Sequence, residues 1–121
     1  ALTASSEDDL RLVRKKKLGS NLKYVIDNGA GDSLSVIFTE TAVLVKGFAH
    51  ENSLNQFTAD EWNQNIIDKM YEGIDEKLIN LFSVTERDKT TFFIWYCGKI
   101  HQNKLSDDDG SKWMLGYICE T

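Results

Sequence analysis

Apolar and polar residues alternate between residues 33 and 39, where positions 34, 36 and 38 are apolar and positions 33, 35 and 39 carry serine or threonine. This period of two predicts a strand that is covered mainly on one face. Residues 22–26 predict a shorter strand before it, separated by the turn-forming cluster Asp27–Asp32. Residues 42–46 predict a third strand, which a tight turn at residues 40–41 joins to the second as a hairpin.

The pattern changes to that of helices between residues 58 and 82. Thr58 and Glu61 have the spacing of a capping box, which predicts the start of a helix at this point. Gly73 is placed to end that helix, and Asp75 to cap a shorter one that ends near Phe82. Two consecutive helices are therefore expected after the third strand.

The first of these helices is predicted to have one apolar side and one acidic side. At 100° per residue, the apolar side consists of Ala59, Trp62, Ile66 and Met70. The opposite side carries Glu61, Asp68 and Glu72. We expect the helix to dock through Trp62 and to present these three carboxylates to solvent.

A further helix is predicted before the first strand. Ser6 can cap it, its first turn is acidic, and its last turn contains the basic run Arg14–Lys17 ahead of Gly19. A favourable interaction with the helix dipole explains the basic run. Anion binding by Lys15–Lys17 is the alternative explanation.

Two segments near the end of the chain are apolar without alternation. Thr91–Cys97 predicts a central strand covered on both faces, and Trp113–Cys119 is predicted to pair with it through a polar turn at Ser106–Ser111. In that hairpin Cys97 and Cys119 lie too far out of register for a disulfide, so two free and mostly buried thiols are expected.

Together these elements predict an α+β fold: an antiparallel β-sheet of about five strands, with an N-terminal helix and two helices inserted between the third and fourth strands. With 121 residues, of which 41% are apolar, the chain is expected to form a single domain over residues 1–121. No stretch approaches the roughly 20 apolar residues of a membrane span, and the first residues lack the apolar core of a signal peptide. A soluble, cytoplasmic protein is therefore expected.

Charge is distributed unevenly along the chain. Residues 1–40 contain six Lys/Arg and six Asp/Glu, so the whole net charge of −5 lies in residues 41–121. An acidic surface repels phosphate backbones, which makes direct nucleic-acid binding unfavourable. The same charge suits a cationic partner, although acidity that merely keeps a protein soluble is the alternative interpretation.

Few residues have the spacing of a catalytic or metal site. His50 and Glu51 follow the third strand and could act as general acid and base, but a histidine that fixes the loop by hydrogen bonds is the favoured interpretation. Cys97 lies in an apolar strand, which argues against a thiolate nucleophile activated by His101. The histidines and cysteines also lack the paired spacing of a structural zinc site. No catalytic residue, cofactor or metal is expected.

Three consecutive aspartates, Asp107, Asp108 and Asp109, precede Gly110 and share part of the pattern of a calcium loop. The alternating carboxylates and the final glutamate of an EF-hand are missing, so a solvated hairpin turn is the favoured interpretation. Contact with a partner is the best functional alternative for this turn.

Three segments resemble small bacterial domains found beside polymorphic-toxin and contact-dependent growth inhibition genes. They are Asn28–Asp32 before a strand, Lys46–Asn52 after the next strand, and the strand segment Thr90–Trp95. The chain therefore resembles an immunity protein of such a system. The resemblance implies a protein without enzymatic activity that binds a cognate bacterial toxin, often a nuclease, and blocks its active site.

The hypothesis from the sequence is an immunity protein that neutralises a cationic nuclease through an acidic surface, without direct nucleic-acid or membrane binding. The candidate partner-binding residues are Glu61, Asp68, Glu72, Asp107, Asp108, Asp109, His50 and Glu51. The alternative is a small ligand-binding or regulatory domain with its pocket between the sheet and the Trp62 helix, near His50 and Glu51. An enzyme of unrecognised type would need an acid/base pair there that titrates near neutrality.

Overall fold

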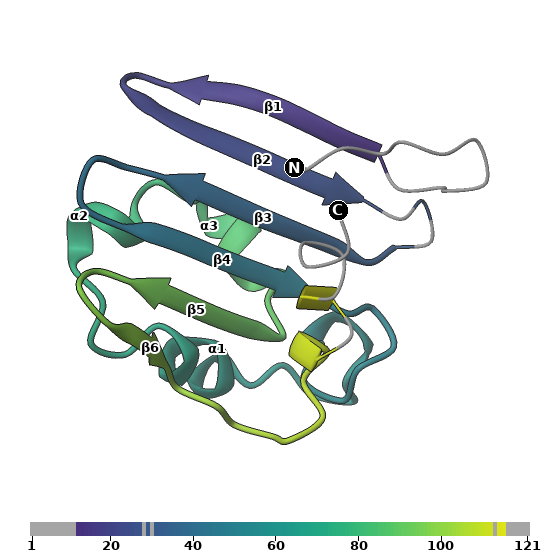
Figure 1. The fold of residues 1–121 in the computed structure, drawn as a ribbon. Helices are drawn as coiled ribbons and strands as arrows, with labels where there is room; N and C mark the ends of the chain where they lie inside the picture. Colours follow the sequence, from purple (N-terminus) through teal and green to yellow (C-terminus); the bar gives the residue numbers. More distant parts are fainter. Residues whose placement is uncertain (1–11, 28, 30, 113, 116–121) are drawn as a thin grey trace.

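The structure, a computed structural model, describes residues 12–27, 29, 31–112 and 114–115. Its main element is one six-stranded antiparallel sheet in which each strand pairs with the next along the chain (Figure 1). The strands are β1 Leu12–Leu18, β2 Asn21–Asp27, β3 Ser33–Phe38, β4 Val43–Phe48, β5 Phe92–Tyr96 and β6 Ile100–Gln102.

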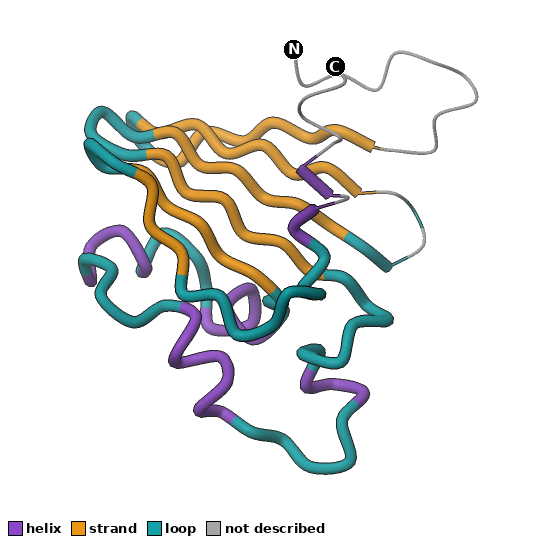
Figure 2. Tube along the Cα trace, turned by 60° about the horizontal axis from the view of Figure 1, so that its bottom comes forward, coloured by secondary structure: helices purple, strands orange, loops and turns teal. Residues whose placement is uncertain are grey.

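The connection between β4 and β5 contains a 3₁₀ turn and three short α-helices, which lie against one face of the sheet (Figure 2). They are η1 Gln56–Thr58, α1 Gln64–Met70, α2 Glu76–Ile79 and α3 Val84–Asp88. The predicted α+β class is therefore confirmed, with six strands instead of about five and three helices in this connection instead of two. None of the helices in the described part of the chain is long and apolar enough to cross a bilayer.

The main core lies between the sheet and these helices. Strand alternation places Ile37, Leu44 and Phe93 on this helix-covered face. They pack with Met70 of α1 and with Phe82, whose ring meets Phe93 edge to face at a centroid distance of 6.0 Å. Full burial of each such side chain contributes about 1.5–3 kcal/mol, so this cluster is the main attachment of the helices to the sheet.

A second cluster covers part of the opposite face of the sheet. Leu34, Val36 and Phe92 pack there with Met114, which is completely buried. Residues 111–112 and 114–115 are helical and close over this face. Because Phe92 and Phe93 are buried on opposite faces, the prediction that the segment from Thr91 is covered on both sides is confirmed for its first half.

The predicted N-terminal helix is wrong for residues 12–18, which form β1 and pair with β2 from Leu12–Asp27 to Leu18–Asn21. Gly19, at φ +63°, closes the tight turn between the two strands instead of ending a helix. Sheet pairing along seven residues outweighs the local charge pattern, so the helix dipole does not explain Lys15–Lys17. The predicted start of this helix at Ser6 lies outside the described residues.

The predicted pairing of the last apolar segment with β5 is also wrong. Gly98, at φ +91°, turns the chain directly after β5, so β6 takes the neighbouring position. Met114 and Leu115 are helical, while Trp113 and residues 116–119 lie outside the described residues. Cys97 is free, as predicted, but it is exposed because it lies at the hairpin turn.

The helix predicted from Thr58 begins six residues later. Asn63 caps α1 by accepting a hydrogen bond from the Asn65 N–H, and Thr58 ends the 3₁₀ turn. Trp62 therefore precedes the helix and is 43% exposed, with its ring against Phe57 at 5.0 Å instead of in the core.

The later boundaries of the helical connection agree better with the sequence. Gly73, at φ +91°, follows α1, and Asp75 caps α2 as predicted. That helix ends at Ile79 instead of near Phe82, because Ser83 and Glu86 form a capping box that begins α3. This second capping box has the same sequence pattern as Thr58–Glu61 and was not identified from the sequence.

We predict that Gly47→Ala destabilises the protein by about 1–3 kcal/mol through overpacking. A Cβ atom at Gly47 would overlap the Phe92 ring, which is only 2% exposed. Urea unfolding measures the change. The double variant Gly47→Ala, Phe92→Leu should lose less stability than the two single variants combined; strict additivity would contradict the contact.

Candidate functional site

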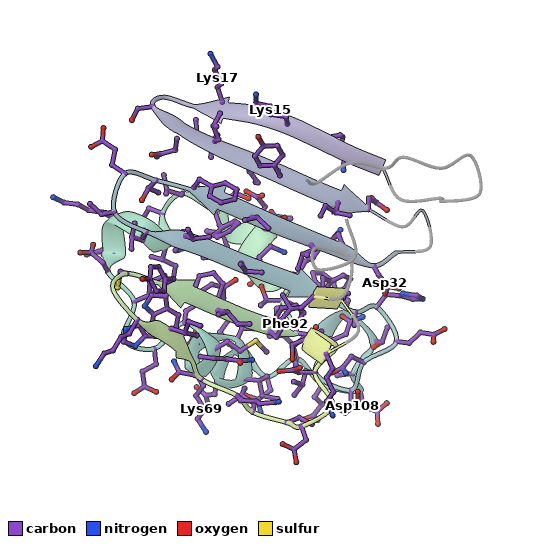
Figure 3. All side chains as sticks on the ribbon, viewed as in Figure 1. Lys15, Lys17, Asp32, Lys69, Phe92 and Asp108 are labelled. Carbon is purple, nitrogen blue, oxygen red and sulfur yellow. The ribbon has the colours of Figure 1, made fainter. Side chains whose placement is uncertain are left out.

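A polar pocket of about 290 Å³ opens where β4 ends and the chain enters β3. We call it the acidic pocket; its lining residues are Asp32, Ala49, His50, Glu51, Asn52 and Asp108. It combines three of the candidate residues named from the sequence, His50, Glu51 and Asp108, with one carboxylate that was not named, Asp32. Figure 3 shows Asp32 and Asp108 at the same end of the sheet, beyond the end of β4.

Pairing of β3 with β4 explains why Asp32 meets His50. Ser33 is opposite Phe48 in the register, so the residues just before β3 and just after β4 are neighbours. Asp32 Oδ1 accepts a hydrogen bond from the His50 backbone N–H at 2.8 Å and lies 2.6 Å from Nδ1 of its ring. The predicted hairpin contained the signal for this contact, because it brings the turn residues before one strand next to the loop after the other.

Further contacts hold His50 in place. The Asn55 side-chain amide donates to the His50 carbonyl at 2.7 Å. Gly31, at φ +103°, lies against the imidazole, where a Cβ atom would be 3.1 Å from Cγ. These bonds agree with a histidine that fixes its loop, and they also hold one ring orientation toward the pocket.

Electrostatics favour the charged form of His50. The hydrogen bond with Asp32 raises the pKa of His50 above its ordinary value, partial burial opposes this, and the charges of Asp32 and Glu51 add to the rise. With Nδ1 directed at Asp32, Nε2 lies 3.6 Å from the Glu51 carboxylate. His50 can therefore carry a proton between the carboxylates of Asp32 and Glu51. When that proton leaves, the ring presents a neutral Nε2.

Asp108 reaches the pocket on a loop that is tied to the opposite wall. The Asn52 side-chain amide donates to the Asp108 carbonyl at 2.7 Å. The Asn52 side-chain oxygen, in turn, accepts a hydrogen bond from the Leu54 N–H at 3.0 Å. Glu51, whose side chain is 90% exposed, and Asp108 thus present carboxylates at the mouth, while Asp32 lies deeper with its side chain 12% exposed.

Asp109, a predicted partner-binding residue, is only 2% exposed, so its carboxylate is buried within the fold and is not presented to solvent. One oxygen of its carboxylate accepts from the Ser111 N–H at 2.9 Å and the other from the Gln102 side chain at 3.3 Å. The Asp109 carbonyl accepts from the Thr91 hydroxyl at 2.8 Å. Asp109 therefore anchors the helical residues after it, whereas Asp107 and Asp108 are exposed.

The predicted acidic stripe does not form on one helix. Glu61, Asp68 and Glu72 are all exposed, but Glu61 precedes α1 and Glu72 follows it. None of the three lines the acidic pocket. Asp68 instead borders a separate hollow of about 350 Å³ beside Tyr71 and Arg87.

Other candidate chemistry is not assembled in the described part of the chain. His101 stacks on Trp95 of the sheet at a ring-centroid distance of 5.2 Å. Within residues 12–27, 29, 31–112 and 114–115, no group of three or more His, Cys, Asp or Glu side chains is placed to hold a metal ion. Trp62 does not line the acidic pocket, which lies at the end of the sheet instead of beside the predicted Trp62 helix.

Replacing Asp109 by alanine is expected to destabilise the protein by about 2 kcal/mol, because it leaves the buried Ser111 N–H and the partly buried Gln102 amide without their acceptors. Asp107→Ala is the matched control, since it removes the same group from an exposed position two residues away. Chemical unfolding distinguishes the two. Equal losses would show that Asp109 is no more structural than its neighbour.

Asp32→Asn should lower the pKa of His50 while preserving the acceptor for its backbone N–H. The folded pKa of His50 is raised, so the stabilising effect of the pair is complete below the unfolded pKa of about 6.5 and is lost as the pH rises through the folded pKa. The stability difference between wild type and variant should therefore be larger near about pH 5.5 than near about pH 8.5. NMR titration of His50 with parallel unfolding curves tests this; a pH-independent difference would contradict it.

The residues of the acidic pocket come from three segments of the chain that the β3–β4 pairing and the Asn52–Asp108 bond bring together. Comparisons of the chain with protein-family models, with curated proteins and with solved structures gave no match.

Proposed function

We propose that this protein is an immunity-type binder that neutralises a cationic bacterial toxin, and that a basic side chain of the toxin enters the acidic pocket. The observation that carries the proposal is the convergence of Asp32, Glu51 and Asp108 on one small opening. Asp32 and Glu51 flank His50 there and Asp108 lines the same opening, so the opening suits a cation. Arginine is the best match, because its planar guanidinium binds two carboxylates at once.

The exposure of the acidic residues supports binding of a protein instead of a buried ligand. Glu51 and Asp108 extend from the rim, where they can meet a surface that approaches the end of the sheet. The net charge of −5 would accelerate encounter with a cationic protein over a longer range. A nuclease offers such a surface, because its active site is built to attract phosphate.

Fixed geometry around His50 supports a tight contact. The hydrogen bonds that the His50 backbone makes with the Asp32 carboxylate and the Asn55 side-chain amide hold the loop before any partner arrives. Binding then costs less conformational entropy than it would for a loop that has to be ordered. Phe57 and Trp62, 53% and 43% exposed, pack on each other farther along this connection and offer apolar area for the same interface.

Binding of a small cationic ligand in the acidic pocket is the second candidate, and the concave form of the site favours it. An amine that fills about 290 Å³ could contact Asp32 and Asp108 together. The two candidates differ in what they require from the rim, because a small ligand depends on Asp32 at depth and a protein depends strongly on Glu51.

Reversing charge at the rim, with Glu51→Lys and Asp108→Lys together, should weaken toxin binding at least about tenfold and abolish rescue on co-expression with the toxin of the neighbouring gene. Glu40→Lys is the matched control, since it lies in the exposed β3–β4 turn at the other end of these strands. A second comparison, Asp68→Lys with Glu72→Lys, tests the surface near α1. Unchanged affinity of the rim variant for the toxin would refute the acidic pocket as the contact. A pull-down with the wild-type protein that recovers no toxin would refute the immunity function.

A further inference from the structure

A basic groove lies on the helix-covered face where the sheet extends beyond the helices. Figure 1 shows β1 and β2 at the edge of the sheet, on the far side of β3 from most of the helical connection, and among the described residues no helix lies over β1. The groove has a volume of about 410 Å³. Its charged residues include Arg14, Lys16, Lys23, Lys46, Lys89 and Glu86.

Strand register concentrates the cations in this groove. Lys16 of β1 is directly opposite Lys23 of β2, and Lys46 of β4 is directly opposite Ser35 of β3. Like charges placed directly opposite each other destabilise a sheet. The groove therefore gathers positive charge at a cost to the fold, in a protein whose net charge is −5.

Two of these lysines are buried, which is rare for this residue. Lys23 is 7% exposed and forms an ion pair with Glu86 of α3, while Lys46 is 3% exposed. The Lys46 ammonium donates to the Lys89 carbonyl at 2.6 Å and makes no ion pair with any described residue. Of the two buried ammonium groups, only that of Lys23 therefore has a carboxylate as its direct partner.

Desolvation lowers the pKa of Lys46 to about 8, and the nearby Glu86 opposes that change. At neutral pH the amine therefore still carries its charge. Burial also disfavours the ionised form of Glu86, but hydrogen bonds from Lys23 and the Ser83 backbone hold the pKa of this carboxyl below its usual value. Glu86 is thus paired directly with Lys23, and Lys46 gains only the weaker attraction of this carboxylate from a longer distance.

The rest of the lining supplies further donors. Ser33 and Ser35 bring hydroxyl groups to the floor of the groove, and Lys16 and Lys89 are exposed at its rim. Arg14 is 3.8 Å from Asp27, with its side chain 67% exposed, so most of its guanidinium stays accessible. Five cations face two carboxylates, which leaves a concave site with excess positive charge.

We propose that the basic groove binds a small phosphate-bearing ligand whose phosphate is held by Lys46, Lys16 and Arg14. Ammonium and guanidinium groups together with serine hydroxyls are the donors that proteins use for phosphate. The volume is in the range of small-molecule sites, and the negative charge elsewhere on the protein disfavours a long polyanion. This ligand is distinct from the cationic partner of the acidic pocket, because the two sites have opposite charge.

Calorimetric titration of the full chain with inorganic pyrophosphate, at constant ionic strength set by sodium chloride, tests the proposal. Saturable binding with one site is expected. Lys16→Gln should weaken it about tenfold, because it removes a charged donor from the rim. Lys15→Gln is the matched control, because it removes the same charge from the preceding residue of β1, whose side chain lies on the other face of the sheet. This variant should change the affinity for pyrophosphate less than about twofold. Figure 3 shows Lys15 and Lys17 on this outer strand.

Lys46→Met provides a second test at the floor of the groove. This variant should lose pyrophosphate binding, and circular dichroism checks that it folds. If it does not fold, the comparison of Lys16→Gln with Lys15→Gln tests the proposal without it. Absence of saturable binding to wild type would overturn the proposal, as would equal losses in the two β1 variants. Tighter binding of a short single-stranded oligonucleotide than of pyrophosphate would overturn the small-ligand assignment.

Discussion

The junction between the end of β4 and the start of β5 is the contact on which the other features depend. Gly47 has no side chain, which allows the Phe92 ring to lie directly against the strand, and the Thr91 N–H donates to the Gly47 carbonyl at 2.8 Å. The Thr91 hydroxyl then accepts from the Ala49 N–H and donates to the Asp109 carbonyl. One buried residue thus joins the loop that carries His50 to the loop that carries Asp108.

Packing at this junction fixes the position of both walls of the acidic pocket. If the close approach at Gly47 were lost, Thr91 would shift and the two walls of the acidic pocket would separate. The buried Asp109 has the same effect from the other loop, since its carboxylate holds the chain that places Asp108 at the rim. The exposed acidic groups therefore depend on neighbours that are themselves buried and hydrogen-bonded.

The sheet is wider than the helical layer that covers it, and this difference separates two kinds of surface. Over β4 and β5, apolar side chains from the sheet and from the helical connection form a buried core. Beside α3, most of the side chains that β1 to β4 contribute to the groove are basic or hydroxylated, and the described residues leave this groove open. Asp32 borders the acidic pocket and Ser33 the basic groove, so consecutive residues lead into sites of opposite charge. The proposed cationic partner and the proposed anionic ligand would therefore not compete for the same groups.

Local patterns in the sequence determined the elements whose signals depend on near neighbours. The alternation at residues 33–39, the turn at residues 40–41, the stop at Gly73 and the cap at Asp75 all appear in the structure. His50, Glu51 and Asp108 were also recognised as candidates, because polar groups in loops after strands are readily noticed. The hairpin prediction implied the Asp32–His50 contact as well, although that consequence depends on register.

Tertiary structure decided the remaining features, because they depend on contacts between distant residues. Residues 12–18 have the charges of a helix terminus, yet pairing with β2 makes them a strand. Thr58 and Ser83 start the same capping pattern, and only the one that lies beside the core begins a helix. Asp107 and Asp109 belong to the same run of three aspartates, and only their burial distinguishes them. Asp107 is exposed, whereas Asp109 is buried and structural. The basic groove combines residues from four strands and a helix, so no local pattern in the sequence indicated it.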